Sequence, residues 1–168
     1  MVTIIDDVLP KTFVDEIVNQ NIDFHETWQN GIDSIKQWIH VCKTTPDDKV
    51  FVLLKQSLNY LQDKTKIKIK DIHRCKLNII KPMNINHDVL HNMIHIDTDP
   101  EPNVIYKSII FYLNDTDGDT VFFDNNKKEI NRCSPQLGRA VIFDSTMFHR
   151  ATPPTSKDRR VINFLIEI

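Results

Sequence analysis

Two side chains that bind metals well stand one residue apart in the segment HNMIHIDTDPEP, residues 91–102. On a β-strand, residues i and i+2 project from the same face, so His95 and Asp97 would point together while Ile96 turns toward the core. One imidazole nitrogen and one carboxylate oxygen could then reach the same metal ion. One more histidine would complete the two-histidine, one-carboxylate arrangement that suits Fe(II) and leaves coordination positions open.

The same segment also allows a different pattern, because His87, His91 and His95 follow one another at four-residue intervals. On a helix these three would share one face and could hold zinc. Pro82 upstream and Pro100 downstream leave little room for such a helix. The asparagines and β-branched isoleucines between them are poor helix formers. We therefore favour the strand, with His87 and His91 as loop residues.

A histidine suited to the same metal lies far downstream, in the segment GRAVIFDSTMFHRATPP. A glycine turn leads into an apolar strand, and after a short polar link His149 begins another segment. Arg159 and Arg160 follow ten and eleven residues later and open the last apolar run. Since the planar guanidinium of arginine binds a carboxylate through two parallel hydrogen bonds, the pattern adds an anion site to a metal site.

In this order, the HxD pair, the distal histidine and the arginine resemble the 2-oxoglutarate- and Fe(II)-dependent dioxygenases. Within that superfamily the chain looks most like the prolyl 4-hydroxylase-like group, which includes short single-domain versions from bacteriophage. The matching segments are IIDDVLPKTFVDEIV, KLNIIKP, SIIFYLNDTDGDTVFF and GRAVIF. The resemblance implies a double-stranded β-helix, or jelly roll, with the metal at its open end.

The resemblance implies that His95, Asp97 and His149 are the iron ligands and form the catalytic centre. It implies Fe(II), the cosubstrate 2-oxoglutarate and O2, with ascorbate as a candidate reductant. In the family, 2-oxoglutarate is oxidatively decarboxylated to succinate and CO2 while the substrate gains a hydroxyl group. Neutral imidazoles and one carboxylate agree with this ligand set.

The far carboxylate of 2-oxoglutarate needs a cation, and the family supplies it from the start of the last strand. Arg159 and Arg160 are adjacent, so on a strand only one of them can face the site. The VINF segment after Arg160 fits the family's pattern, whereas the spacing from His149 is more common for Arg159. We prefer Arg160 and assign Arg159 to the surface.

Five further residues are candidates for the 2-oxoglutarate pocket: Tyr112, Asn78, Lys81, Thr152 and Asn163. Tyr112, in FYLND, matches a tyrosine that donates a hydrogen bond to the same carboxylate in related enzymes, although it could also be an ordinary core residue. Asn78 and Lys81 lie in the strand before the HxD pair. The segments 83–92 and 98–107 are the expected lids, since loops over such sites carry the substrate contacts.

The elements that must position these residues change character near residue 66. Residues 1–65 read as helical, with Pro10 before one helix and Thr45 as N-cap before another. Residues 66–168 contain short β-rich runs separated by turns. These runs are IKIK, KLNII, VIYKSIIFYL, TVFF, RAVIF and RRVINFLIEI.

We therefore expect a single domain over residues 1–168, mainly β with N-terminal helices. Residues 1–65 would form a helical support on the outside of one sheet, and residues 66–168 the double-stranded β-helix core. The final run is almost wholly apolar, and at a sheet edge it would invite aggregation, so we place it inside a sheet.

Composition excludes several other classes. A chain of 168 residues with 40% hydrophobic residues can build a folded core. A net charge of −2 with scattered charges disfavours a nucleic-acid binder, and three glycines are too few for a GxGxxG or P-loop motif. Three cysteines without a CxxC pair, no signal peptide and no membrane-spanning run predict a soluble cytoplasmic protein, in the host cytoplasm if viral, with buried free thiols.

The function expected from these residues is hydroxylation of a peptidyl prolyl or a small amino-acid-like substrate. Demethylation of alkylated nucleic-acid bases is an alternative, and enzymes of that kind resemble an RxNxxxxR pattern after the distal histidine. Here Asn163 lies three residues after Arg160 instead of two, and no second arginine follows. A non-catalytic metal- or ligand-binding module of the same fold is another alternative. The partner would be a peptide, a protein or a small molecule, and the sequence identifies neither the substrate nor the oligomeric state.

Overall fold

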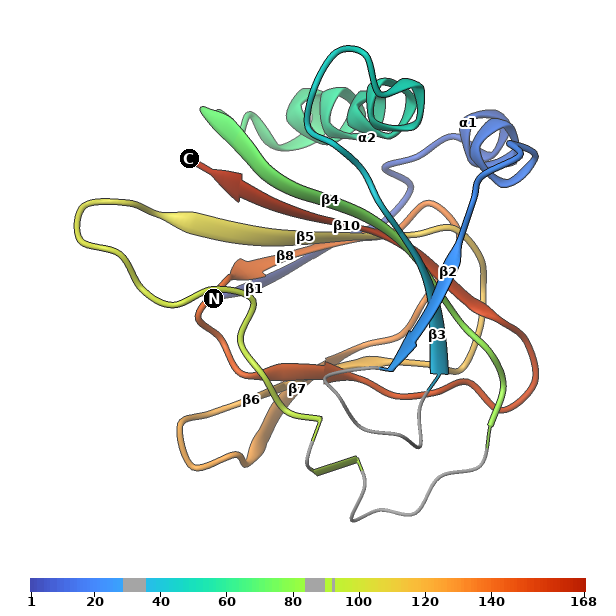
Figure 1. The fold of residues 1–168 in the computed structure, drawn as a ribbon. Coiled ribbons are helices and arrows are strands. Elements are labelled where there is room, and N and C mark those ends of the chain that lie inside the picture. Colours follow the sequence, from blue (N-terminus) through green and yellow to red (C-terminus); the bar gives the residue numbers. More distant parts are fainter. Residues whose placement is uncertain (29–35, 84–89, 92) are drawn as a thin grey trace.

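The chain forms two antiparallel sheets that face one another, with both helices against the outer face of the larger sheet (Figure 1). The structure, a computed structural model, describes residues 1–28, 36–83, 90–91 and 93–168. The larger sheet has the order β1 (Val2–Ile5), β8 (Ala140–Asp144), β5 (Tyr106–Tyr112), β10 (Arg159–Glu167), β4 (Asp71–Ile80), β3 (Lys36–Val41) and β2 (His25–Trp28). The smaller sheet has the order β7 (Glu129–Cys133), β6 (Thr120–Phe123) and β9 (His149–Ala151). The helices are α1 (Lys11–Val18) and α2 (Lys49–Thr65).

This arrangement confirms the predicted fold class, which is mainly β with helices outside one sheet. The last strand, β10, pairs with β4 on one side and β5 on the other, so it is internal to its sheet as predicted. Of the described helices, none is long and apolar enough to cross a membrane.

The larger sheet buries different residues on its two faces, and this division positions the site. On β10, Ile162, Phe164 and Ile166 join the core beneath the helices. The alternate residue Val161 joins a second core between the two sheets, together with Tyr112 and other large apolar side chains. Because side chains alternate along a strand, polar residues on the second face can line a cavity between the sheets while the first face holds the helices.

The N-terminal part differs from the helical support that we expected. Besides α1 and α2, residues 1–65 contribute the strands β1, β2 and β3, and β1 closes one edge by pairing with β8. These strands are short and carry mixed polar residues, so their sequences give only a weak period-two signal.

The boundaries of α2 also correct the sequence reading. The N-cap is Asp48 rather than Thr45, because the Asp48 carboxylate accepts a hydrogen bond of 2.9 Å from the Phe51 N–H. The helix ends at Thr65, and its C-cap is Lys66, which has a left-handed φ of 61°. The IKIK segment that follows forms no strand in the described structure, and β4 begins at Asp71.

Candidate active site

The backbone brings the HxD segment directly beside the distal histidine. His95 and His149 form an isolated antiparallel bridge, in which each N–H donates to the carbonyl of the other at 3.0 and 2.9 Å. Two residues on, the Asp97 N–H donates to the Ser145 carbonyl at 2.8 Å. Residues 95–97 are therefore extended, and their side chains alternate as the strand hypothesis requires.

The three side chains converge on one point. One ligand atom from each of His95, Asp97 and His149 lies within 4.8 Å of the others, and His149 Nε2 is 3.6 Å from Asp97 Oδ2. This spacing is compatible with a shared metal ion.

Both imidazoles are held in the tautomer in which Nε2 can bind a metal. His95 Nδ1 lies 2.9 Å from the Met93 carbonyl, and His149 Nδ1 lies 2.9 Å from the Met147 carbonyl. Since a carbonyl can only accept, each Nδ1 must carry the proton, and each Nε2 then carries the lone pair that a metal binds.

The Asp97 carboxylate is fixed by two residues that the sequence reading missed. Arg74 on β4 donates to Oδ1, and Ser108 on β5 donates to Oδ2 at 2.5 Å. Burial by itself would raise the pKa of Asp97, but the adjacent His149, the Arg74 guanidinium and the Ser108 hydroxyl lower it below its usual value. The carboxylate is therefore ionised and held in one orientation at neutral pH. The sequence held one signal for Arg74. It lies four residues before Asn78 on β4, and an even spacing on a strand puts both side chains on the same face, here the cavity face.

His149 is almost enclosed, with the Phe143 ring centroid 4.6 Å from that of its own ring. Burial and the neighbouring His95 lower the pKa of His149 to about 4. The imidazole is consequently neutral at pH 7, which is the form that coordinates metals.

A cavity of about 60 Å³ opens beside these ligands, between the two sheets. His95 and His149 form part of its wall, together with Arg159, Thr120 and Asn78. The cavity wall therefore combines two histidines that can bind a metal with polar side chains that can bind an anion.

Arg159, and not Arg160, is the arginine in this cavity. Arg159 is 3% exposed and donates from Nε to the Gly118 carbonyl at 2.7 Å and from Nη2 to Thr120 Oγ1 at 2.9 Å. The Arg160 side chain is 36% exposed and lies 3.3 Å from Asp158 Oδ2. Arg160 shares the helix-side face of β10 with Ile162, so the sequence-based preference for it is corrected in favour of Arg159.

The other predicted pocket residues have different places. Asn78 lines the cavity, and its Oδ1 is buried with no hydrogen-bond partner among the described residues. Tyr112 does not line the cavity itself but contacts two residues that do. Its hydroxyl lies 2.7 Å from Thr120 Oγ1, and the Arg159 guanidinium lies 5.6 Å from the centre of its ring. Lys81 is not in the cavity wall, since its ammonium binds Asp158 Oδ2 at 2.9 Å at the surface.

Gln37 and Asn163 also line the cavity, and Asn163 Oδ1, like Asn78 Oδ1, has no hydrogen-bond partner within the described part of the chain. We had not predicted Gln37, because its strand was read as part of a helical region.

The alternative with three histidines on one helix does not fit His95, which is extended. His91 is exposed and follows Leu90 in a helical conformation rather than a loop. His87 lies outside the described residues, as does most of the predicted lid 83–92.

Comparison with known proteins agrees with this geometry. The family model of the 2OG-Fe(II) oxygenase superfamily matches residues 84–167, which is half of the 168-residue chain. The chain belongs to the 2OG-Fe(II) oxygenase superfamily. No match is found among curated proteins.

Solved structures of 2OG-Fe(II) oxygenases share the fold at low sequence identity. A prolyl-4-hydroxylase from Pseudomonas putida has a TM-score of 0.64 and 14% identity, covering 99% of this chain and 91% of that one. A viral collagen prolyl hydroxylase from Paramecium bursaria Chlorella virus-1, in complex with 2OG, has a TM-score of 0.63 and 17% identity, covering 99% and 95%. A prolyl hydroxylase from Trichoplax adhaerens, in complex with a hypoxia inducible factor peptide fragment, has a TM-score of 0.66 and 17% identity, covering 99% and 83%.

Membership in the 2OG-Fe(II) oxygenases implies Fe(II), 2-oxoglutarate and O2, and the residues present fit them. Two neutral imidazoles and one carboxylate are a ligand set suited to Fe(II) that leaves coordination positions open. Arg159 is a buried cation with no ion pair among the described residues, so its guanidinium is suited to bind a carboxylate in the cavity. The predicted double-stranded β-helix and its cofactors are therefore confirmed at the level of the superfamily.

Proposed function

We propose that this oxygenase is an Fe(II)- and 2-oxoglutarate-dependent hydroxylase that acts on a prolyl residue of a peptide or on a small amino-acid-like substrate. The observation that carries this proposal is the convergence of His95, Asp97 and His149 beside the buried Arg159. The prolyl hydroxylases among the structures of similar fold support the substrate class.

His95, Asp97 and His149 would hold the iron, and the bound iron supplies the oxidative chemistry that uses O2 and 2-oxoglutarate. The chain's own contribution is to keep these ligands in place before metal arrives. The carbonyls of Met93 and Met147 orient the two rings, while Arg74 holds the carboxylate. Such fixed ligands need little reorganisation when the metal binds.

Arg159 would bind the far carboxylate of 2-oxoglutarate, and Thr120 would contribute its hydroxyl to the same pocket. Two of the five guanidinium donors are used by Gly118 and Thr120, so the fork has further N–H groups to offer. Tyr112 acts through Thr120 and the Arg159 guanidinium, since its hydroxyl bonds the first and its ring packs against the second. We propose it as a positioning residue.

Asn78 is proposed to contact 2-oxoglutarate through its side-chain amide. Its oxygen is buried without a donor among the described residues, and so is that of Asn163. Rotating either amide about its terminal torsion exchanges the NH2 group and the oxygen, and the NH2 group can donate to a carboxylate.

The test is incubation of the iron-loaded protein with 2-oxoglutarate, O2 and a panel of proline-containing peptides and free amino acids. Succinate measured by NMR reports oxygenase activity, and a gain of one oxygen atom in a peptide, located on proline by mass spectrometry, reports the substrate. We expect both products, formed in equal amounts.

The two readouts separate the general function from the substrate. Succinate without hydroxyproline would contradict the prolyl proposal and leave the oxygenase assignment standing. No succinate with any substrate, from protein shown to contain iron, would contradict the proposal as a whole and favour a non-catalytic module.

A further inference from the structure

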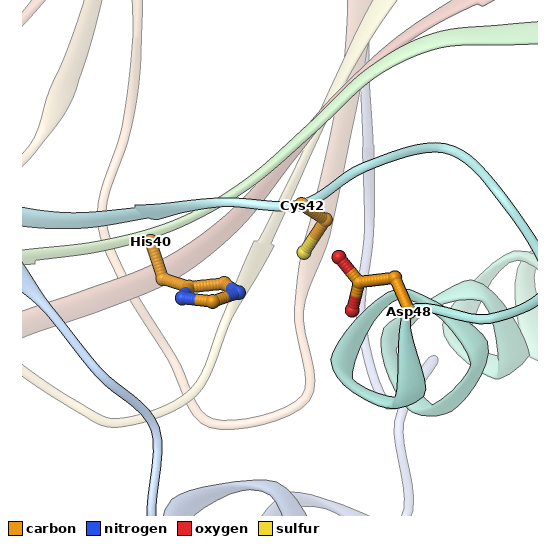
Figure 2. A group of neighbouring side chains, drawn as sticks. All are labelled: His40, Cys42 and Asp48. Atoms are coloured by element: carbon orange, nitrogen blue, oxygen red, sulfur yellow. The ribbon is translucent and has the colours of Figure 1, made fainter.

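A second group of metal-binding side chains lies on the other face of the larger sheet. His40 on β3, Cys42 just beyond that strand and Asp48 before α2 each offer one ligand atom, and these atoms lie within 4.8 Å of one another. Figure 2 shows the imidazole, the thiol and the carboxylate pointing toward one another. His40 pairs with Leu77, which belongs to the core beneath the helices, whereas the active-site cavity lies on the face of Asn78. The two groups are therefore on opposite sides of the sheet.

His40 is held in the tautomer that leaves one ring nitrogen available to a metal. Its Nδ1 lies 2.8 Å from the Asp23 carbonyl, so Nδ1 carries the proton and Nε2 carries the lone pair. Nε2 is buried and has no hydrogen-bond partner among the described residues. A carbonyl fixes the rings of His95 and His149 in the same way. A buried acceptor without a donor is unfavourable, and a bound cation would satisfy it.

Asp48 supplies a carboxylate that is already in place. Its two oxygens accept hydrogen bonds from the N–H groups of Phe51 at 2.9 Å and Lys43 at 2.8 Å. Partial burial opposes ionisation, but these backbone donors lower the pKa of Asp48 below its usual value. Each carboxylate oxygen has a second lone pair, so a cation can bind without displacing either N–H.

Cys42 determines which metal the group suits. It is buried and free of any disulfide, and the Cys75 thiol lies against it. The Cys75 S–H can donate a hydrogen bond to Cys42 Sγ, which supports Cys42 as a ligand. A thiolate combined with an imidazole and a carboxylate favours Zn²⁺ over the harder cations. The active-site triad, which is His95, Asp97 and His149, has only nitrogen and oxygen donors.

We propose that His40, Cys42 and Asp48 bind one Zn²⁺, with the fourth position left to a solvent molecule. Binding releases the proton of the Cys42 thiol to solvent and changes no oxidation state. The ion would fasten the end of β3 to the first turn of α2 across the connection 43–47. This site is independent of the proposed function, because it shares no residue with the triad.

The test uses Co²⁺ as a probe of the full chain carrying His149→Ala, which removes one ligand of the triad. A thiolate ligand gives Co²⁺ a charge-transfer band that nitrogen and oxygen ligands do not give. We expect this band, saturating at one equivalent of Co²⁺ and lost on addition of Zn²⁺. Adding Cys42→Ser should abolish the band, whereas Cys133→Ser, which removes a buried thiol of the other core, should preserve it.

A second variant keeps the test decisive if Cys42→Ser does not fold. Asp48→Asn retains one side-chain oxygen to cap the helix at the Phe51 N–H, but it loses the charge and the acceptor of the Lys43 N–H, so without metal it should fold and melt only slightly below its parent. Its Zn²⁺ affinity should fall at least about tenfold. No charge-transfer band in the folded His149→Ala protein, a band unchanged by Cys42→Ser, or unchanged zinc affinity in Asp48→Asn would each overturn the proposal.

Discussion

The Arg159 guanidinium is buried beside the triad, and no carboxylate forms an ion pair with it among the described residues. Burial lowers the pKa of Arg159, yet arginine keeps its proton at neutral pH. The charge is therefore costly until a ligand carboxylate compensates it. Arg159→Gln should weaken 2-oxoglutarate binding by about 100-fold, since removing one partner of a buried charge pair costs about 2–5 kcal/mol. Calorimetric titration with Mn²⁺ in place of iron measures this.

The neighbouring arginine supplies the matched control. Arg160 is half-exposed and contacts Asp158, so Arg160→Gln should change 2-oxoglutarate affinity by less than about twofold. A large loss in Arg160→Gln together with normal affinity in Arg159→Gln would restore the assignment that the sequence favoured.

Arg74 should act on metal binding through Asp97, because its guanidinium holds the carboxylate oxygen that Ser108 does not. Arg74→Gln should weaken Mn²⁺ affinity by about 10–100-fold, as loss of a partner of a metal ligand generally does. Arg132→Gln, which breaks ion pairs on β7, should leave that affinity unchanged. Equal Mn²⁺ affinities in the native protein, Arg74→Gln and Arg132→Gln would show that metal binding by Asp97 does not depend on Arg74.

The lowered pKa of His149 predicts how the metal-free protein responds to pH. The folded value is about 4, against about 6.5 in an unfolded chain, so between these values the unfolded state binds more protons. Stability should therefore fall by roughly 3 kcal/mol as pH decreases from about 6.5 to about 4. His149→Gln should flatten this slope in urea titrations with a chelator present, whereas His91→Gln, an exposed change, should not. If the stability of His149→Gln still fell with pH as in the native protein, the pH dependence would belong to other groups.

At the scale of elements, α2 depends on the residue that caps it. Asp48→Ala should lower the free energy of unfolding by about 1 kcal/mol in chelator, because its carboxylate accepts from the Phe51 N–H. Thr45→Ala should change it by only a few tenths, since Thr45 is not the N-cap. Urea titration compares the two, and a larger loss for Thr45→Ala would return the cap to the position that the sequence indicated.

The last strand shows how far sequence reasoning reaches. Its apolar composition correctly predicted that β10 is internal, but it could not tell which face lines the cavity. Both faces are rich in apolar residues, and the larger ones, such as Phe164, pack beneath the helices rather than toward the metal. The preference for Arg160 rested on the VINF segment that follows it, and this pattern does not tell which face of the strand is turned toward the cavity, where the structure has Arg159.

The triad could be predicted from the sequence because two of its members, His95 and Asp97, share one short segment. The spacing of His95 and Asp97 requires only a locally extended chain, and the structure brings His149 beside them. The spacing from Asn78 places Arg74 on the cavity face, but the contacts of Arg74 and Ser108 with Asp97 depend on the pairing of strands distant in sequence, which no local pattern encodes.

At the scale of the whole molecule, the site joins the two sheets. His149 belongs to the smaller sheet, whereas Arg74, Ser108 and Arg159 belong to the larger one. Metal and 2-oxoglutarate should therefore stabilise the entire fold, by about 2.7 kcal/mol for a ligand at 100 times its dissociation constant. This corresponds to a rise in Tm of about 5–10 °C, which differential scanning fluorimetry with Mn²⁺ and 2-oxoglutarate measures. In His149→Ala the shift should largely disappear, and a full shift there would place the ligands elsewhere.

The central claim is that one metal ion, held by His95, Asp97 and His149, lies next to a 2-oxoglutarate molecule held by Arg159. Its most direct test is the visible absorption of the anaerobic protein with Fe(II) and 2-oxoglutarate, because chelation of the keto acid by Fe(II) produces a metal-to-ligand charge-transfer band. We predict this band in the native protein and in Arg160→Gln, a much higher 2-oxoglutarate requirement in Arg159→Gln, and no band in His149→Ala. A band of full intensity in His149→Ala, or none in the native protein at saturating ligand, would contradict the account.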